Sequence, residues 1–272
     1  WQQKYLPMQW SRAVTILIHK KGETSDPSNF RPITLESVAL KIFTSLIRDR
    51  MYTFLIKNEY IESNIQKGFV PGMSGTYEHL ANLTHINNNN ILDLRNAFGE
   101  VNHNLIQTVL DYHQVPQFMR DLVKIIYSDF RTSIITDLYK TQYLKVKKGV
   151  LQGDCLSPLL FNLTINTFIK NIQKNDYNQF GYRFDLELLP RHWFQFADDA
   201  AAITSIESEN QILLNEFTRW CNWAEMLIRV DKWHSFGIQK VGSTSMQLKP
   251  KLYLNNEYIK PIEIDEPYIY LG

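Results

Sequence analysis

The sequence predicts an α+β fold, because segments typical of strands and of helices both occur but do not alternate regularly along the chain. Short apolar runs such as "VTILI" favour strands, whereas longer segments with apolar residues every three or four positions favour helices. The chain has 272 residues, of which 44% are hydrophobic, enough for one large core or for two subdomains. We therefore expect a folded protein of mixed secondary structure.

The first half of the chain predicts these elements in irregular order. Residues 14–18 predict a strand that runs into a basic turn, and "DPSNFRPITL" predicts an extended loop broken by proline. Apolar residues recur at helical spacing from Ser37 to about Ile56. The following segments predict a glycine-punctuated loop, a helix at residues 76–86, a buried strand in "ILDL", two helices within residues 104–130 separated at Pro116, and a hairpin at residues 131–146.

The second half predicts a hairpin between two long helices. Ser157 can cap the first helix, and Pro158 suits its first position. "HWFQFADDAAAIT" predicts the hairpin, and the tail predicts short strands around an Asn-Asn turn at Asn255 and Asn256. The second helix, at about residues 208–227, has a plausible inner face formed by Ile212, Phe217, Trp220, Cys221 and Ala224.

Composition excludes several classes of protein. The net charge of +1 does not by itself indicate a nucleic-acid partner, so any such surface must be local. No apolar run approaches the ~20 residues that span a bilayer, and the first residues lack the regions of a signal peptide, so we expect an intracellular protein without a membrane partner. Cys155 and Cys221 lack ligand spacing, which favours two buried thiols over a disulfide or a zinc site.

Three aspartates are the candidate catalytic residues of this sequence. Asp198 and Asp199 are adjacent in a run otherwise suited to the interior of a sheet, which conflicts with the cost of burying a carboxylate unless they lie at a hairpin tip and face cations. Asp93 lies at the end of a probable strand, after Ile91 and Leu92. If this strand lies beside the hairpin, Asp93 and Asp198 would meet, with Asp199 adjacent. Such carboxylates repel one another unless divalent cations bind. Two Mg²⁺ ions, ~3.5–4 Å apart, would support nucleotidyl transfer.

Each of these residues also has a simpler interpretation when taken alone. Asp198 and Asp199 would suit a solvent-exposed hairpin tip, and Asp93 would suit the cap of a helix that starts near Arg95. Phe98 by itself is typical of a core aromatic residue. Taken together, these residues favour the metal site over the simpler interpretations, because they belong to a longer series of motifs.

Five blocks of sequence occur along the chain in a fixed order. They are "ILIHKKG" with "DPSNFRPITL", then "LDLRNAF", "GVLQGDCLSPLLFNL", "FADD", and "LIRVDKWHSFGI" with the terminal "YIYLG". Together they resemble the reverse transcriptase domain of non-LTR (LINE-type) retrotransposons over nearly the whole length. The resemblance implies the fingers and palm of a right-hand polymerase, with an antiparallel palm sheet backed by helices and the thumb absent. It implies fingers with some palm elements at residues 1–90, and a palm at residues 91–272 with a fingers-side insertion near 104–148.

The resemblance also implies roles for individual residues. Asp93 and Asp198 match the principal metal ligands and Asp199 a secondary one, for two Mg²⁺ ions or Mn²⁺ as a substitute. Phe98 matches the steric gate against ribonucleotides, and Lys232 matches a lysine proposed to protonate departing pyrophosphate. Two departures, Gly99 in place of an acidic residue and Phe196 in place of the tyrosine, remove no metal ligand. The residues that match contacts to the incoming nucleotide are Lys20, Arg31, Gln152 and Gly153.

The implied activity is RNA-directed DNA polymerisation that serves retrotransposition, by target-primed reverse transcription. The implied partners are an RNA template, a DNA primer or nicked target DNA, and deoxynucleoside triphosphates. A thumb, an endonuclease and nucleic-acid-binding domains are expected on the full polypeptide. If the element is a eukaryotic retrotransposon, we expect the protein in the nucleus and cytoplasm. Two alternatives stay open: a group II intron-like or other cellular reverse transcriptase, and a catalytically inactive RNA-binding scaffold of the same fold.

Overall fold

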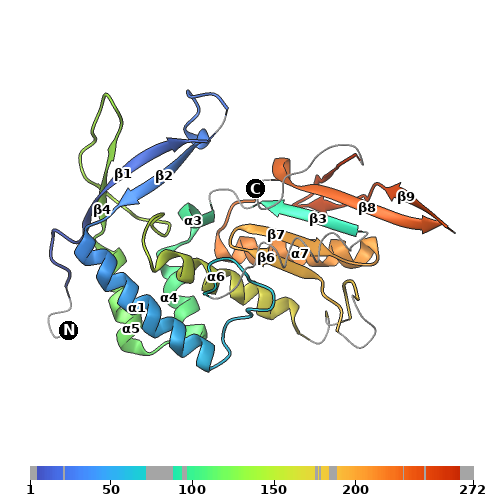
Figure 1. Cartoon of the computed structure of the whole chain (residues 1–272), viewed down its shortest axis with the longest axis horizontal. Helices are drawn as coiled ribbons and strands as arrows, with labels where there is room; N and C mark the ends of the chain where they lie inside the picture. Colours follow the sequence, from blue (N-terminus) through green and yellow to red (C-terminus); the bar gives the residue numbers. More distant parts are fainter. Residues whose placement is uncertain are drawn as a thin grey trace. The chain divides into compact units, whose positions relative to one another are not determined.

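The computed structural model of the chain describes residues 5–20, 22–71, 88–93, 97–174, 177, 179–183, 189–228, 230–241 and 243–263. The chain forms two compact units, residues 1–60 with 98–164 and residues 61–97 with 165–272 (Figure 1). Strands and helices do not alternate regularly in either unit, which confirms the predicted α+β class. The helix predicted at residues 76–86 lies outside the described residues. The division into fingers and palm at residue 90 stays a prediction.

The first unit is built on a four-stranded sheet in the order β2-β1-β4-β5, with β1 antiparallel to β2 and parallel to β4. The predicted proline-broken loop is wrong, because residues 30–35 form β2. Pro32 is compatible with this strand because β2 lies at the sheet edge, where a missing N–H costs no ladder bond. The strands are β1 (Arg12–His19), β2 (Phe30–Leu35), β4 (Arg131–Ile135) and β5 (Leu144–Lys145), and the short helix η1 (Pro27–Asn29) precedes β2.

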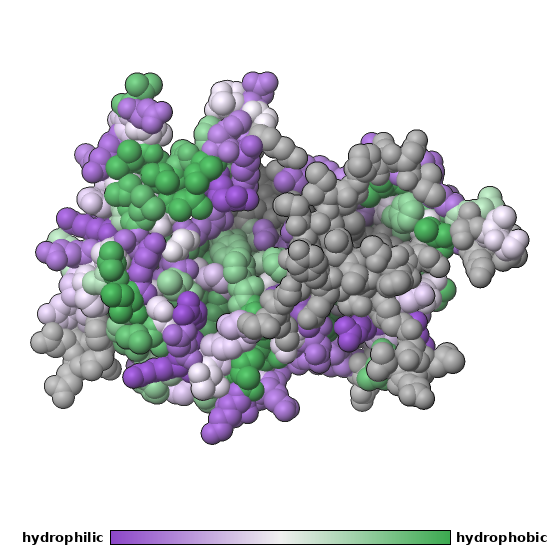
Figure 2. Space-filling model, in the orientation of Figure 1, coloured by the Kyte–Doolittle hydropathy of each residue, from purple (hydrophilic) through white to green (hydrophobic). Residues whose placement is uncertain are grey.

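Helix α1 (Val38–Lys57) confirms the predicted helix in this region, and the side chain of Ser37 caps it by accepting from the N–H of Leu40. Its buried side is formed by residues such as Met51 and Leu55. Three apolar side chains on another side are exposed: Val38, Ile42 and Leu46. Figure 2 shows that hydrophobic side chains gather on the left of the visible face.

The next helices along the chain follow the sequence closely, and the last of them begins in the first unit and ends in the second. Pro116 separates α4 (His103–Tyr112) from α5 (Gln117–Ser128), as predicted, and the four-residue α3 (Ala97–Glu100) precedes them. Helix α6 (Ser157–Ile172) begins where expected, but Ser157 is its first helical residue and not its cap. Asp154 takes the capping role, because its Oδ2 accepts from the backbone N–H groups of Leu156 at 3.0 Å and Ser157 at 3.2 Å.

The second unit is built on a six-stranded sheet in the order β12-β8-β3-β7-β6, with β9 paired to β8. All of its pairings are antiparallel except that of the two-residue β12 with β8. The predicted Asn-Asn turn is confirmed, because Asn255 and Asn256 both have positive φ and join β10 to β11. The strands are β3 (Asn88–Asp93), β6 (Trp193–Phe196), β7 (Asp199–Ile203), β8 (His234–Val241), β9 (Thr244–Leu248), β10 (Tyr253–Leu254), β11 (Glu257–Tyr258) and β12 (Lys260–Pro261).

Aromatic residues form the core of this unit, between its sheet and helices α6 and α7 (Glu207–Ala224). Phe168 of α6 meets Trp193 of β6 edge to face at 4.8 Å and Phe217 of α7 at 5.1 Å. The predicted inner face of α7 is confirmed except at Ile212, which is 40% exposed. Among the described residues, no helix combines the length and the apolar character needed to cross a membrane.

The two cysteines are both free thiols. Cys221 lies in the α7 core, and burial raises the pKa of its thiol. Cys155 is only half-buried, so the prediction of two buried thiols holds for Cys221 alone.

Candidate active site

The two adjacent aspartates lie at the tip of the β6–β7 hairpin, as the sequence predicts. Phe196 pairs with Asp199 across the hairpin, which leaves Ala197 and Asp198 as a two-residue turn. Both aspartates are half-buried, whereas the alanines that follow them in β7 are fully buried. The turn therefore places the carboxylates at the end of the sheet and the apolar residues in its interior.

Strand β3 brings the third aspartate to the same end of the sheet. β3 lies beside β7 (Figure 1), and the register makes Asp93 the Cα partner of Asp199. Directly paired residues of antiparallel strands have Cα atoms about 4.5–5.5 Å apart. The structure thus brings the backbone of Asp93 directly opposite Asp199, one residue from Asp198.

Lys232 lies at this end as well. It closes the short helix η2 (Val230–Lys232) before β8, and the β3–β8 register pairs Ile91 with His234. Lys232 therefore precedes the first paired residue of β8 by two positions. Its side chain is exposed, and its predicted role stays a prediction.

The three aspartates fit a divalent metal by the chemistry of their donors, because Mg²⁺ and Mn²⁺ bind carboxylate oxygens. The side chains of β3 are outside the described part of the structure, so Asp93 is placed by its backbone alone. Among the side chains that are described, no group of three or more His, Cys, Asp or Glu residues could hold a metal ion. The metal-ligand roles of Asp93, Asp198 and Asp199 stay predictions that the register supports.

Buried glutamines next to the turn were missed by the sequence interpretation. The Nε2 of Gln195 donates to the carbonyl oxygens of Ala197 at 2.8 Å and of Asp199 at 3.2 Å, and its Oε1 accepts from the indole N–H of Trp193 at 2.8 Å. A polar residue inside the apolar run "WFQF" was the available signal. Gln66 contacts the same turn from a distant segment and gave no such signal.

The residues predicted to contact a nucleotide lie in the first unit. Phe98 stacks on Phe161 with ring centroids 4.7 Å apart. Lys20 and Arg31 are exposed, at the end of β1 and in β2, and Arg31 is the Cα partner of Ile18. Their roles at a nucleotide stay predictions.

Gln152 and Gly153 contact β2, and this structural role partly explains why these two residue types occur here. The backbone O of Gln152 accepts from the N–H of Thr34 at 2.7 Å. Gly153 has φ +116°, and an added Cβ would lie 2.7 Å from the Thr34 carbonyl oxygen. Glycine is therefore required here for the approach to β2, whatever its relation to a nucleotide. The Oε1 of Gln152 is buried and accepts no hydrogen bond within the described chain.

A pair of carboxyl groups lies near this loop. Burial is the main cause that raises the pKa of Glu36 to about 8, and the charge of Asp154 raises it further, whereas Lys41 opposes the shift. No N–H or O–H group of the described chain donates to either Glu36 oxygen, and both are shielded from solvent. An ionised Asp154 carboxylate can only accept a hydrogen bond, so it cannot stabilise a negative charge on Glu36. With a pKa of about 8, Glu36 is therefore mainly protonated at neutral pH.

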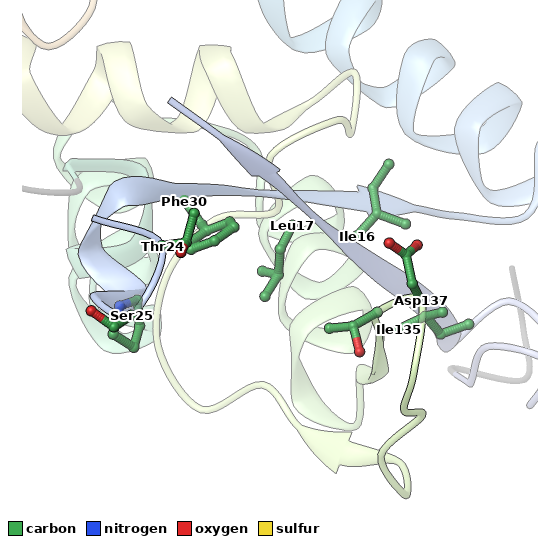
Figure 3. A pocket seen from close by; sticks show the side chains of 9 residues that line it. Ile16, Leu17, Thr24, Ser25, Phe30, Ile135 and Asp137 are labelled. Carbon is green, nitrogen blue, oxygen red and sulfur yellow. The ribbon is translucent and has the colours of Figure 1, made fainter. Parts of the chain in front are cut away.

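A hollow in the first unit is separate from all of these residues. It has a volume of about 530 Å³ and lies on the sheet of the first unit, where Leu17 projects between Phe30 and the segment of Ile135 and Asp137 (Figure 3). Its lining is mostly apolar and includes none of the predicted site residues. The site is therefore assigned by the strand register and not by a cavity.

Comparison with known proteins shows which family the chain resembles. Residues 18–258 match the family model described as "Reverse transcriptase (RNA-dependent DNA polymerase)". The chain is 24% identical, over 98% of its length, to the retrovirus-related Pol polyprotein from type-1 retrotransposable element R2 of Nasonia vitripennis, and it spans 26% of that relative. It is 30% identical, over 59% of its length, to the probable RNA-directed DNA polymerase from transposon BS of Drosophila melanogaster, of which it spans 18%.

A solved structure shares the fold. The apo telomerase from Candida tropicalis superposes with a TM-score of 0.59 at 11% identity, over 88% of this chain and 47% of that chain. This likeness confirms the predicted fold, the fingers and palm of a right-hand polymerase. The chain spans about a quarter of the length of the R2 relative. The family model matches most of the length of this chain. The chain therefore belongs to the reverse transcriptase (RNA-dependent DNA polymerase) family.

Proposed function

We propose that this chain carries the catalytic centre of an RNA-directed DNA polymerase, which extends a DNA primer on an RNA template by two-metal nucleotidyl transfer. The observation that supports this most directly is the register that sets Asp93 opposite Asp199, with Asp198 in the adjoining turn. Three acidic positions at one sheet end are unfavourable without cations, so the arrangement has a reason in metal binding and none in stability.

In this proposal the chain's own residues hold and orient the reactants. The carboxylates of Asp93 and Asp198 bind the metals, and Asp199 supports them from the paired position. Bound Mg²⁺ would activate the primer 3′-hydroxyl and neutralise charge on the triphosphate and the pyrophosphate. Lys232, which precedes the paired start of β8 by two residues, would donate a proton to the departing pyrophosphate.

The residues of the first unit would select the substrate. We assign Phe98 to excluding a ribose 2′-hydroxyl, so that deoxynucleoside triphosphates are preferred. Lys20 and Arg31 would pair with triphosphate oxygens, for which an arginine fork is well suited. Gln152 and Gly153 would lie against the incoming nucleotide, and the orphan Oε1 of Gln152 offers an acceptor for it.

The biological process that we propose is retrotransposition by target-primed reverse transcription, with nicked target DNA as the primer. The support for it is the name of the R2 relative, which the chain matches over 98% of its own length. An intron-derived or other cellular reverse transcriptase would share the same centre, so a primer preference for nicked duplex DNA over a free primer is the property that separates these processes.

Primer extension on an RNA template tests the proposal. The variant Asp198→Asn keeps the shape of the side chain but removes its charge, and we expect activity to fall by about 100-fold or more, because metal stabilisation of charge is worth several kcal/mol. Asp129→Asn changes an exposed aspartate paired with Arg131 and serves as the matched control. Undiminished synthesis by Asp198→Asn would refute the assignment, and loss in both variants would point to a general defect.

A further inference from the structure

The turn that carries Asp198 has a backbone conformation that must be imposed by its surroundings. Ala197 has φ +52°, a region that residues with a Cβ rarely adopt. Such residues keep this conformation only where neighbouring groups determine it. In addition, three acidic positions at this sheet end repel one another before cations bind, which favours relaxation of the turn.

Gln66 determines the conformation from outside the hairpin. Its Oε1 accepts from the N–H of Ala197 at 3.0 Å and from the N–H of Gly68 at 2.8 Å. Gln66 is fully buried, so water does not compete for these donors. Its Nε2 has no partner within the described chain, and the side chain therefore acts through the oxygen.

The segment around Gln66 is fixed to β6 by backbone hydrogen bonds. Lys67 N–H donates to the carbonyl of Gln195 at 2.9 Å, and Gln195 N–H donates to the carbonyl of Ile65 at 3.1 Å. The side chain of Gln195 holds the opposite side of the turn through the carbonyls of Ala197 and Asp199. Two buried amides from different segments thus hold both the N–H and the C=O of Ala197.

Gly68 completes the contact. A Cβ at this position would lie 2.3 Å from the backbone N of Ala197 and 2.9 Å from the backbone C of Phe196. Because both atoms belong to the backbone of the turn, no side-chain rotation could relieve the overlap. Any substitution of Gly68 therefore displaces the turn or the segment that holds it.

We infer that Gln66, Gly68 and Gln195 are positioning residues, which hold the Ala197–Asp198 turn in the conformation that binds metal. This inference rests on the proposed function, because it assigns the metal to Asp198. Residues one layer outside the ligands typically change metal affinity by about 10–100-fold when they are replaced. The effect should therefore appear in the affinity for the metal and not only in turnover.

The test is binding of Mn²⁺ alone, followed by the paramagnetic resonance signal of the free ion, together with the Mg²⁺ dependence of primer extension. Gln66→Met keeps the length of the side chain but removes the acceptor, and we expect the concentration for half-saturation to rise about tenfold or more. Gln66→Glu keeps an oxygen acceptor and should bind metal more tightly than Gln66→Met. Gln247→Met makes the same chemical change at a glutamine whose Nε2 donates to Ile262 and should match the wild type.

Gly68→Ala is the second variant, because it alters the turn while retaining every hydrogen-bonding group. It should show the same rise in half-saturation as Gln66→Met, and it decides the question if Gln66→Met does not fold. Either variant, folded and binding Mn²⁺ like the wild type, would overturn the inference. In that case Asp198→Asn separates two explanations. If it also binds Mn²⁺ and polymerises normally, the proposed function has failed. If it loses both metal binding and polymerisation, the proposed function stands and only the positioning role is refuted.

Discussion

The buried carboxyl of Glu36 predicts how the stability of the first unit depends on pH. Glu36 connects β2 to α1, and both of its oxygens are shielded from solvent beside Asp154. The substitution Glu36→Gln replaces a carboxyl that is buried in its protonated form with an amide that is neutral at every pH. The amide can also donate a hydrogen bond to Asp154, which an ionised Glu36 cannot.

The magnitude follows from the pKa, which rises from 4.5 to about 8 on folding. As the pH increases, the unfolded chain releases this proton first, so the contribution of Glu36 is complete below pH 4.5 and is lost progressively up to pH 8. Each pKa unit corresponds to about 1.36 kcal/mol, which gives a maximum of roughly 5 kcal/mol over this interval. Between pH 5 and pH 8 the glutamine variant should therefore gain about 2–4 kcal/mol relative to the wild type.

Urea unfolding of both proteins at pH 5, 6, 7 and 8, followed by tryptophan fluorescence, measures this difference. Glu23→Gln removes an exposed carboxylate of the same unit and should give a curve parallel to that of the wild type. A difference between Glu36→Gln and the wild type that stays constant across the pH range would refute the reasoning. It would show that the Glu36 carboxyl is ionised in the folded protein at all these pH values.

Two further substitutions test the first unit. Phe98→Ala should destabilise the protein by about 2 kcal/mol through the lost stacking on Phe161, and it should increase ribonucleotide incorporation in competition assays; unchanged sugar discrimination would count against the gate. Gly153→Ala should cost roughly 1–3 kcal/mol, because its φ is +116° and its Cβ would meet the Thr34 carbonyl; an unchanged urea midpoint would show that β2 yields at this contact.

The sequence predicts those elements whose signals are local. The β6–β7 hairpin, the break at Pro116 and the Asn255–Asn256 turn all follow from residues that are neighbours along the chain. The position of Asp198 and Asp199 at the hairpin tip was also predictable, because buried charge is costly and aspartates within an apolar run have few structural explanations. Only the register was added by the structure, which pairs Asp93 with Asp199.

Features that depend on distant contacts were not predictable. Pro32 argued for a loop, but β2 is a strand because β1 supplies a partner on one side and no second strand of the sheet needs the missing N–H on the other. Ile212 is a different case, because it lies off the helical stripe that the buried Leu213, Phe217 and Cys221 form on α7, and its exposure follows from that position. Asp154 replaces Ser157 as the cap because the chain before α6 turns back toward its first N–H groups.

Residues that position a metal ligand are harder to recognise in a sequence than the ligand itself. Asp198 violates the burial rule for charged groups, so its position alone demands an explanation. Gln66 violates no local rule, since an amide and a glycine suit the loop "QKGF" as well as any other. Its importance arises only from the hydrogen bond to Ala197, 131 residues further along the chain. If that bond fixes the turn, the metal affinity of this centre is determined partly by a residue without charge, and a search restricted to acidic residues would miss it.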